Sequence, residues 1–221
     1  MGAPAGEAFN VSYAVHEIFY SLQGEGANAG RPAVFCRFAG CNLWSGREQD
    51  RGAAICRFCD TAFVGTGGSG GGRFATPEDL ADAIVRHWPE SGDARPFVVL
   101  TGGEPLLQLD EGLLAHLHAR GSKVALETNG TLLPPVGLDW ICVSPKAGAE
   151  LCLDRGDELK LVFPQEGAEP EAFEHLDFTH FFLQPMDGPD LDRNIRLAVA
   201  RCLARPRWRL SLQTHKLLGL R

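Results

Sequence analysis

The stretch Phe97-Val98-Val99-Leu100-Thr101-Gly102-Gly103-Glu104-Pro105 decides the fold that the sequence predicts. Its first five residues form a short apolar run, and the glycines and proline that follow are typical of a tight turn after a buried strand. Similar runs occur at residues 33–38, 123–128, 140–144, 158–163 and 180–184. Amphipathic segments separate these runs, so the pattern indicates parallel β/α units.

Helices are expected at 76–88, 110–120, 170–176 and 191–203. Thr76 is a good N-cap and Pro77 suits the first helical position, while Gly121 is a C-cap for the second helix. Six strands are too few for a closed eight-stranded barrel. We therefore expect an α/β fold, an open partial (β/α)6 barrel, with functional residues at the carboxyl ends of its strands.

Length and charge restrict the class of protein further. The 221 residues fit a single domain, 1–221, and 21 Lys and Arg against 28 Asp and Glu give a net charge of −7. We expect neither a nucleic acid nor a membrane as partner. No apolar run approaches the roughly 18–20 residues of a membrane span, and Met1–Asn10 lacks the features of a signal peptide. A cytoplasmic location is predicted. The segment Gly65–Gly72 is expected to be a flexible loop, with a phosphate-binding loop as the alternative.

Seven cysteines in a chain of this kind suggest reduced thiols or metal ligands rather than disulfides. Cys142, Cys152 and Cys202 are scattered, and we expect them to be buried as small apolar side chains. The other four lie close together in the sequence: Cys36, Cys41, Cys56 and Cys59.

The spacing C-x14-C-x2-C of Cys41, Cys56 and Cys59 follows the first predicted strand. Three thiolates on a four-iron cluster leave one iron free for another ligand. The alternative adds Cys36 as a fourth ligand and gives a structural zinc site. Strand alternation favours the first interpretation, because it places Cys36 on the apolar face and Arg37 on the opposite one.

These features resemble those of the radical S-adenosylmethionine superfamily. In that superfamily a three-cysteine loop follows the first strand, and a Gly-Gly-Glu-Pro turn follows the second strand. The usual spacing there is C-x3-C-x2-C, and the longer spacing of this chain is similar to one branch, the 7-carboxy-7-deazaguanine synthases of 7-deazapurine biosynthesis. Further motifs similar to that branch occur in matching order over residues 13–220: Tyr20–Gly26, Cys59–Thr61, Glu127–Gly130, Ser144–Lys146, Gln184–Gly188 and Gln213–Lys216.

The resemblance implies a radical lyase. It would contract the ring of 6-carboxy-5,6,7,8-tetrahydropterin to give 7-carboxy-7-deazaguanine, with loss of ammonia, on the route to queuosine and related 7-deazapurines. The implied cofactors are a [4Fe-4S] cluster, S-adenosylmethionine used catalytically, and Mg²⁺. The implied partners are the small pterin, an electron donor such as a flavodoxin, and a second copy of the chain in a homodimer.

Site residues follow from the same resemblance. The cluster would be held by Cys41, Cys56 and Cys59 in a loop at 39–75, and Mg²⁺ would contact Thr61. Contacts with S-adenosylmethionine are implied for Gly103, Glu104, Ser144, Pro145, Lys146, Gln184, Pro185, Met186 and Asp187. Contacts with the substrate are implied for Leu22, Gln23, Gly24, Glu25, Arg37, Thr101, Glu127, Asn129 and His215. No side chain is expected to act as a catalyst itself, and a tail at 205–221 would close the site.

Several alternatives stay open at this point. Arg37 could pair with an acidic surface residue, Glu127 could belong to a core salt bridge, and His215 could be a solvated tail residue. The chain could also be another radical enzyme, such as an activase that installs a glycyl radical on a protein. A zinc-stabilised binding module is the alternative from a different class.

Overall fold

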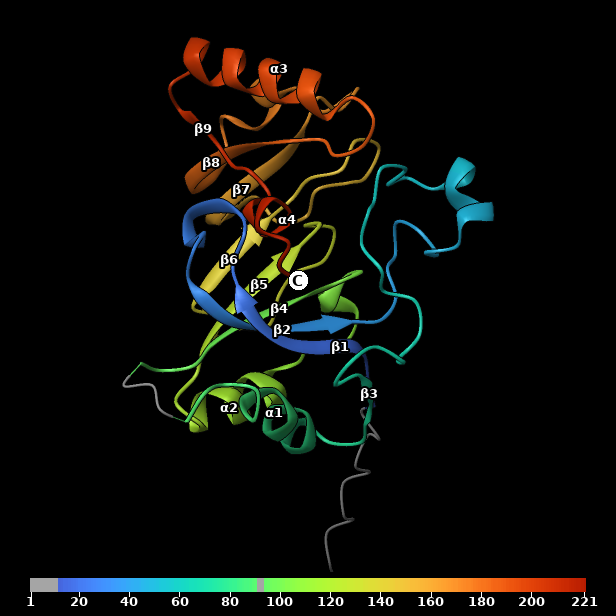
Figure 1. Ribbon diagram of the computed structural model, residues 1–221, viewed down its shortest axis with the longest axis vertical. Coiled ribbons are helices and arrows are strands. Elements are labelled where there is room, and N and C mark those ends of the chain that lie inside the picture. The colour runs from blue at the N-terminus through green and yellow to red at the C-terminus, as the bar shows by residue number, and fades with distance from the viewer. Residues whose placement is uncertain (1–11, 91–93) are drawn as a thin grey trace, which may run out of the picture.

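The computed structural model describes residues 12–90 and 94–221, and its central element is one sheet (Figure 1). Within that part of the chain the sheet has nine strands, in the order β3-β1-β2-β4-β5-β6-β7-β8-β9. Their bounds are β1 Tyr13–Leu22, β2 Pro32–Phe38, β3 Gly72–Phe74, β4 Phe97–Gly102, β5 Lys123–Thr128, β6 Trp140–Val143, β7 Arg155–Phe163, β8 Asp177–Pro185 and β9 Trp208–Leu210. β2 and the strands β4 to β9 are parallel to one another, and β1 runs antiparallel to both β2 and β3.

The six predicted strands are all present, as β2 and β4 to β8, and the open α/β architecture is confirmed. β1 was not predicted. Its pairing with β2 shifts between Val15 and Glu17, so a bulge breaks the alternation by which a strand is recognised. β3 and β9 have three residues each and are too short to show a period.

Four α-helices accompany the sheet in the described residues: α1 Pro77–Val85, α2 Glu111–Ala119, α3 Leu191–Ala204 and α4 Thr214–Leu218. The predicted N-cap of α1 is present, because Asp79 N donates to Thr76 Oγ1 at 3.1 Å, and Gly121, with φ +76°, directly follows the last turn of α2 as predicted. Asp110, which was not predicted as a cap, accepts from Leu113 N at 2.9 Å at the start of α2. The segment expected to be a helix at 170–176 is a short 3-10 helix, Pro170–Phe173. The connections from β5 to β6 and from β6 to β7 contain no helix, so the six β/α repeats are incomplete.

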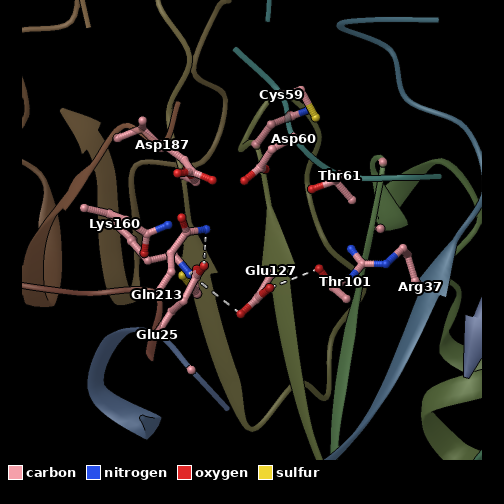
Figure 2. A pocket seen from close by; sticks show the side chains of 18 of the residues that line it. Glu25, Arg37, Cys59, Asp60, Thr61, Thr101, Glu127, Lys160, Asp187 and Gln213 are labelled. Atoms are coloured by element: carbon pink, nitrogen blue, oxygen red, sulfur yellow. Dashed lines mark hydrogen bonds and ion pairs between the residues drawn. The ribbon is translucent and has the colours of Figure 1, made fainter. Parts of the chain in front are cut away.

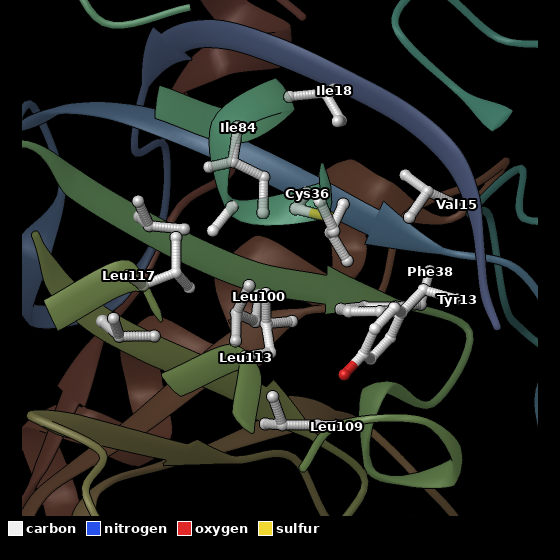
Figure 3. Packing of buried hydrophobic residues seen from close by; sticks show 14 of the residues in the cluster. Tyr13, Val15, Ile18, Cys36, Phe38, Ile84, Leu100, Leu109, Leu113 and Leu117 are labelled. Atoms are coloured by element: carbon white, nitrogen blue, oxygen red, sulfur yellow. The ribbon is translucent and has the colours of Figure 1, made fainter. Parts of the chain in front are cut away.

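The helices α1 and α2 cover one face of β1, β2, β4 and β5 and enclose the larger apolar core. Figure 3 shows the Cys36 side chain in this core, near Ile84 and Leu100. Cys36 is fully buried, and burial raises the pKa of its thiol. A second core lies between α3 and the strands β6 to β9. The opposite face of β2, β4 and β5 carries a third, smaller apolar cluster that includes Phe35, Val99 and Ala125. Polar residues follow on this face toward the carboxyl ends of the strands.

The glycine-rich segment 65–72 is not the flexible loop that we expected. It runs along β1, where Ile18 N donates to Ser69 O at 2.9 Å and Gly68 N donates to His16 O at 3.0 Å. A Cβ added at Gly71 would lie 2.1 Å from His16 O, so the glycines permit close backbone approach. Among the helices of residues 12–90 and 94–221, none has the length and apolar character needed to cross a membrane.

Candidate active site

A cavity of about 360 Å³ lies at the carboxyl ends of the parallel strands. Residues from the end of β1, from β2 and β4 to β8, from the 39–75 loop and from the C-terminal tail line it (Figure 2). Every predicted site residue lines this cavity except Glu104 and Pro145. The topology thus brings together segments that are separated by up to 200 residues of sequence, as in the hydrogen bond from Ser21 to Arg221.

The three thiols of the cysteine loop line one wall of the cavity. The Cys56 thiol donates to Cys59, and this bond, with others from Thr61, lowers the pKa of Cys59 to about 6. Leu43 N donates to Cys41 Sγ at 3.4 Å. The same bond, together with burial, raises the pKa of Cys56, so these two thiols share one proton that must leave before both can bind metal as thiolates.

The donor set fits a cluster held by three protein ligands. Cys36 lies in the apolar core on the other face of the sheet, so the four-cysteine site that we kept as an alternative does not form. In the described part of the chain, no group of three or more His, Cys, Asp or Glu side chains is arranged to hold a single ion. A four-iron cluster makes a different demand, because each thiolate binds a different iron.

The turn after β4 has a structural role that the sequence did not show. Gly102 has φ +139°, and a Cβ at Gly103 would lie 2.0 Å from Gly40 O. The two glycines therefore let the end of β4 pack against the backbone that precedes Cys41, in addition to any contact with a ligand.

Glu104 differs from its predicted role, since its carboxylate faces the protein instead of the cavity. It is fully buried and accepts hydrogen bonds from Thr128 Oγ1 at 2.8 Å, Asn129 N at 2.8 Å and Leu106 N at 3.0 Å. Burial raises its pKa, although these donors oppose the shift. Glu104 thus fixes the end of β5 and the position of Asn129, which lines the cavity.

The segments after β6 and β8 form another wall. Lys146 Nζ donates to Ser144 O at 2.5 Å and to Ser144 Oγ at 2.7 Å, and burial lowers the pKa of this lysine. Pro145 lies outside the cavity, where its carbonyl accepts from Gln165 Nε2 at 3.4 Å. The predicted stretch Gln184–Asp187 lines the cavity.

Two carboxylates from distant segments, Glu25 and Glu127, lie across the cavity from Cys59 (Figure 2). Glu127, at the end of β5, accepts from Gln23 Nε2 and from Thr101 Oγ1, both at 3.0 Å. Glu25 accepts from Gln213 Nε2 at 3.0 Å and pairs with Lys160 Nζ at 2.5 Å. Burial by itself would raise the pKa of Glu25, but the charge and hydrogen bond of Lys160 lower it to about 2.

Arg37 lines the cavity, as predicted, and it also has an acidic partner. Its Nε is 2.9 Å from Glu17 Oε1, and Arg221 Nη2 is 3.2 Å from Glu17 Oε2. Arg37 thus has an acidic partner, but Glu17 lines the cavity and is 13% exposed, so it is not the surface residue of the alternative. Both guanidinium groups carry positive charge at the end of the cavity formed by β1 and β2.

The C-terminal tail packs over the turn that follows β1. Thr214 N and Oγ1 donate to Gly24 O at 3.0 and 2.9 Å, and a Cβ at Gly24 would lie 2.1 Å from His215 Nδ1. His215 is half-buried against this turn rather than solvated. Lys216 Nζ lies 2.5 Å from both Asp60 and Asp187, and so joins the tail to the cysteine loop and to the end of β8.

Several residues at the site were not among those predicted: Glu17, Asp60, Cys142, Lys160, Lys216 and Arg221. A signal for one of them was present, because Lys160 alternates with leucines inside an apolar strand, where a charge needs a partner. The expectation for the scattered cysteines was right for Cys142, which is buried. It was wrong for Cys152, which is exposed, and Cys202 is half-buried.

Comparison with known proteins agrees with this geometry. The family model of the Radical SAM superfamily matches residues 50–157. The 7-carboxy-7-deazaguanine synthase of Caulobacter vibrioides is 64% identical over 210 residues, which are 95% of this chain and 100% of that protein. The enzyme of the same name from Burkholderia multivorans is 59% identical over 210 residues, with the same shares of 95% and 100%.

A solved structure supports the same conclusion. The crystal structure of QueE from Escherichia coli superposes with a TM-score of 0.68 at 28% sequence identity, covering 91% of this chain and 93% of the other. The chain therefore belongs to the radical S-adenosylmethionine superfamily and, within it, to the 7-carboxy-7-deazaguanine synthase family.

Proposed function

We propose that this cavity is the active site of a 7-carboxy-7-deazaguanine synthase, which contracts the ring of 6-carboxy-5,6,7,8-tetrahydropterin with loss of ammonia. The observation that carries the proposal is the arrangement of one cavity, with three free thiols on one wall and the carboxylates of Glu25 and Glu127 on the other. A glycyl-radical activase needs the thiols but has no use for a paired carboxylate site for a small molecule.

The residues that would hold the cofactors are those of the cysteine loop and of the strand ends. Cys41, Cys56 and Cys59 would bind the cluster, and Lys146 with the segment Gln184–Asp187 would contact S-adenosylmethionine. When bound, these cofactors supply the one-electron chemistry that removes a hydrogen atom from the substrate. The protein contributes position and the exclusion of water.

The carboxylates suit one edge of a pterin. Its guanidine-like edge presents N–H donors, and an ionised carboxylate forms short, strong hydrogen bonds with such donors. Glu127 is held by Gln23 and Thr101, so its oxygens have a fixed orientation before the substrate arrives. This arrangement orients the ring relative to the cysteine wall.

The carboxylate of the substrate would lie at the opposite, cationic end. A guanidinium binds a carboxylate in a planar fork, which Arg37 can offer beside its bond to Glu17. Thr61 also lines this cavity, and its hydroxyl could bind Mg²⁺ together with a substrate oxygen and water. A flavodoxin-type electron donor and a homodimer remain predictions from the family.

The experiment is an anaerobic assay of the cluster-loaded protein with S-adenosylmethionine, reductant, Mg²⁺ and the carboxypterin. We expect a product with the mass of 7-carboxy-7-deazaguanine, no net consumption of S-adenosylmethionine, and a lower rate without Mg²⁺. Cofactor cleavage with no new deazapurine would overturn the proposal and favour the activase.

A further inference from the structure

The strand β7 places two charged side chains on the inner face of the sheet. Glu158 and Lys160 are 3% and 5% exposed, and they are separated by Leu159, so both side chains point to the same side. Burying either charge without a partner would cost several kcal/mol. The two opposite charges partly compensate each other, and groups from other elements supply the rest.

The charge of Lys160 is compensated by two carboxylates from segments that are far apart in the sequence. Its Nζ lies 2.5 Å from Glu25 Oε2 and 3.7 Å from Glu127 Oε1. Glu25 belongs to the turn after β1, and Glu127 is the last but one residue of β5, so one ammonium group joins β7 to both elements. Figure 2 shows the three side chains together at one wall of the cavity.

The carboxylate of Glu158 holds the backbone of the same turn after β1. Ala27 N donates to Glu158 Oε2 at 2.9 Å, and a Cβ on Gly26, which has φ +63°, would lie 1.9 Å from Glu158 Oε1. The turn that carries Gln23 and Glu25 is thus held at two points by adjacent inner-face residues of β7. Lys160 differs from Glu158 in also reaching Glu127.

The charges around Lys160 explain why its ammonium group matters. Three carboxylates, of Glu25, Glu127 and Glu158, face this one cation, together with the Cys142 thiol; Lys146 is a second cation nearby and His215 faces Glu25. These carboxylates raise the pKa of Lys160 well above its ordinary value despite burial. Without the ammonium, like charges would repel one another, and burial would favour protonated carboxylic acids.

We propose that Lys160 is a positioning residue of the active site, whose ammonium group holds the carboxylates of Glu25 and Glu127 together to accept N–H donors of the substrate. The inference rests on the proposed function. Lys160 makes its closest contacts with Glu25 and Glu127 and acts on the substrate through them. Its loss should therefore affect substrate binding more than turnover.

The test compares Lys160→Met with the matched control Lys123→Met, which removes an exposed lysine from β5. We expect the KM for the pterin to rise at least about tenfold in Lys160→Met, because two charge-assisted acceptors lose their fixed position, with a smaller change in kcat. Titration calorimetry of the pterin into unreduced, cluster-loaded protein should show the same loss of affinity. Lys123→Met should bind the pterin as the wild type does.

Two further readouts separate positioning from a general loss of structure. In Lys160→Met the acid limb of the profile of kcat/KM against pH should move to higher pH, because Glu25 no longer has the partner that keeps it ionised. In the double-mutant cycle with Glu25→Gln, the loss of affinity caused by Lys160→Met should be smaller than in the wild-type background. If Lys160→Met alone fails to fold, Glu25→Gln/Lys160→Met is compared with Glu25→Gln instead, because the double variant buries no unpaired charge at these two positions. Lower pterin affinity in the double variant would then show the effect of Lys160 through Glu127, and equal affinity would overturn the inference.

An unchanged KM and an unmoved acid limb in Lys160→Met would overturn the inference, as would full additivity in the cycle. If the wild type converts the pterin while these results are found, the proposed function stands and only the role of Lys160 fails. If the wild type binds no pterin and converts none, the proposed function itself fails.

Discussion

The contrast between Cys36 and Cys56 gives the sharpest prediction, because both thiols are buried, at 0% and 5% exposure, but on different faces of the sheet. In Cys36→Ala the core loses one sulfur atom. A lost group of about methylene size costs ~0.8 kcal/mol in transfer free energy, and the cavity left behind adds a similar amount. We expect the free energy of unfolding to fall by about 1–2 kcal/mol, which at this length lowers Tm by about 2–8 °C.

The assay measures iron and sulfide per chain after anaerobic reconstitution, together with thermal denaturation. Cys36→Ala should keep the wild-type content of about four irons and produce deazapurine. Cys56→Ala should lose the cluster and all turnover. Loss of the cluster in Cys36→Ala would refute the reasoning, because it would make Cys36 a ligand despite its place in the apolar core.

Three other predictions follow from the site. Arg37→Ala should raise the KM for the pterin at least about tenfold, because a guanidinium–carboxylate bond is charge-assisted; steady-state kinetics that match the wild type would remove Arg37 from the site. The pKa of Glu25 is lowered from 4.5 to about 2 in the folded protein. The ionised carboxylate therefore adds to the free energy of unfolding above pH 4.5, and this contribution is lost as the pH falls toward 2. Thermal denaturation should therefore show the stability gap between wild type and Glu25→Gln narrowing over that window, and a constant gap would contradict the assignment. Lys216→Met should cost under about 1 kcal/mol of unfolding free energy, because the lysine is 38% exposed, yet raise the KM for S-adenosylmethionine; an unchanged KM would show that the tail does not hold Asp187 in place.

Local patterns were sufficient for the parts of the fold that depend on neighbouring residues. The alternation along β2 placed Cys36 and Arg37 on opposite faces, and the structure confirms this division. The cap at Thr76 depends on a residue three positions away, so the start of α1 was visible in the sequence. No helix was expected at residues 129–139 or 144–154 from the local pattern, and none forms there, although a (β/α)6 barrel would place a helix in each connection.

The environment of the predicted site residues was outside the reach of such patterns. Glu104 has the sequence of a ligand-binding turn, but its carboxylate caps the end of β5 through Thr128 and Asn129. Arg37 pairs with Glu17 across a bulged antiparallel strand whose register no local rule predicts. The glycines at 65–72 predicted a flexible loop, whereas in the structure they allow the backbone to pack closely against β1.

The sequence by itself determined six of the nine strands, that their carboxyl ends meet, and that three thiols follow the first parallel strand. The strands depend on local alternation, and the meeting of their ends depends on one topological rule. Only the tertiary structure decided how the charges are compensated. Lys160 meets Glu25 across 135 residues and Lys216 meets Asp60 across 156. A buried charge signals that it needs a partner, but which partner it finds depends on how the sheet brings distant strand ends together.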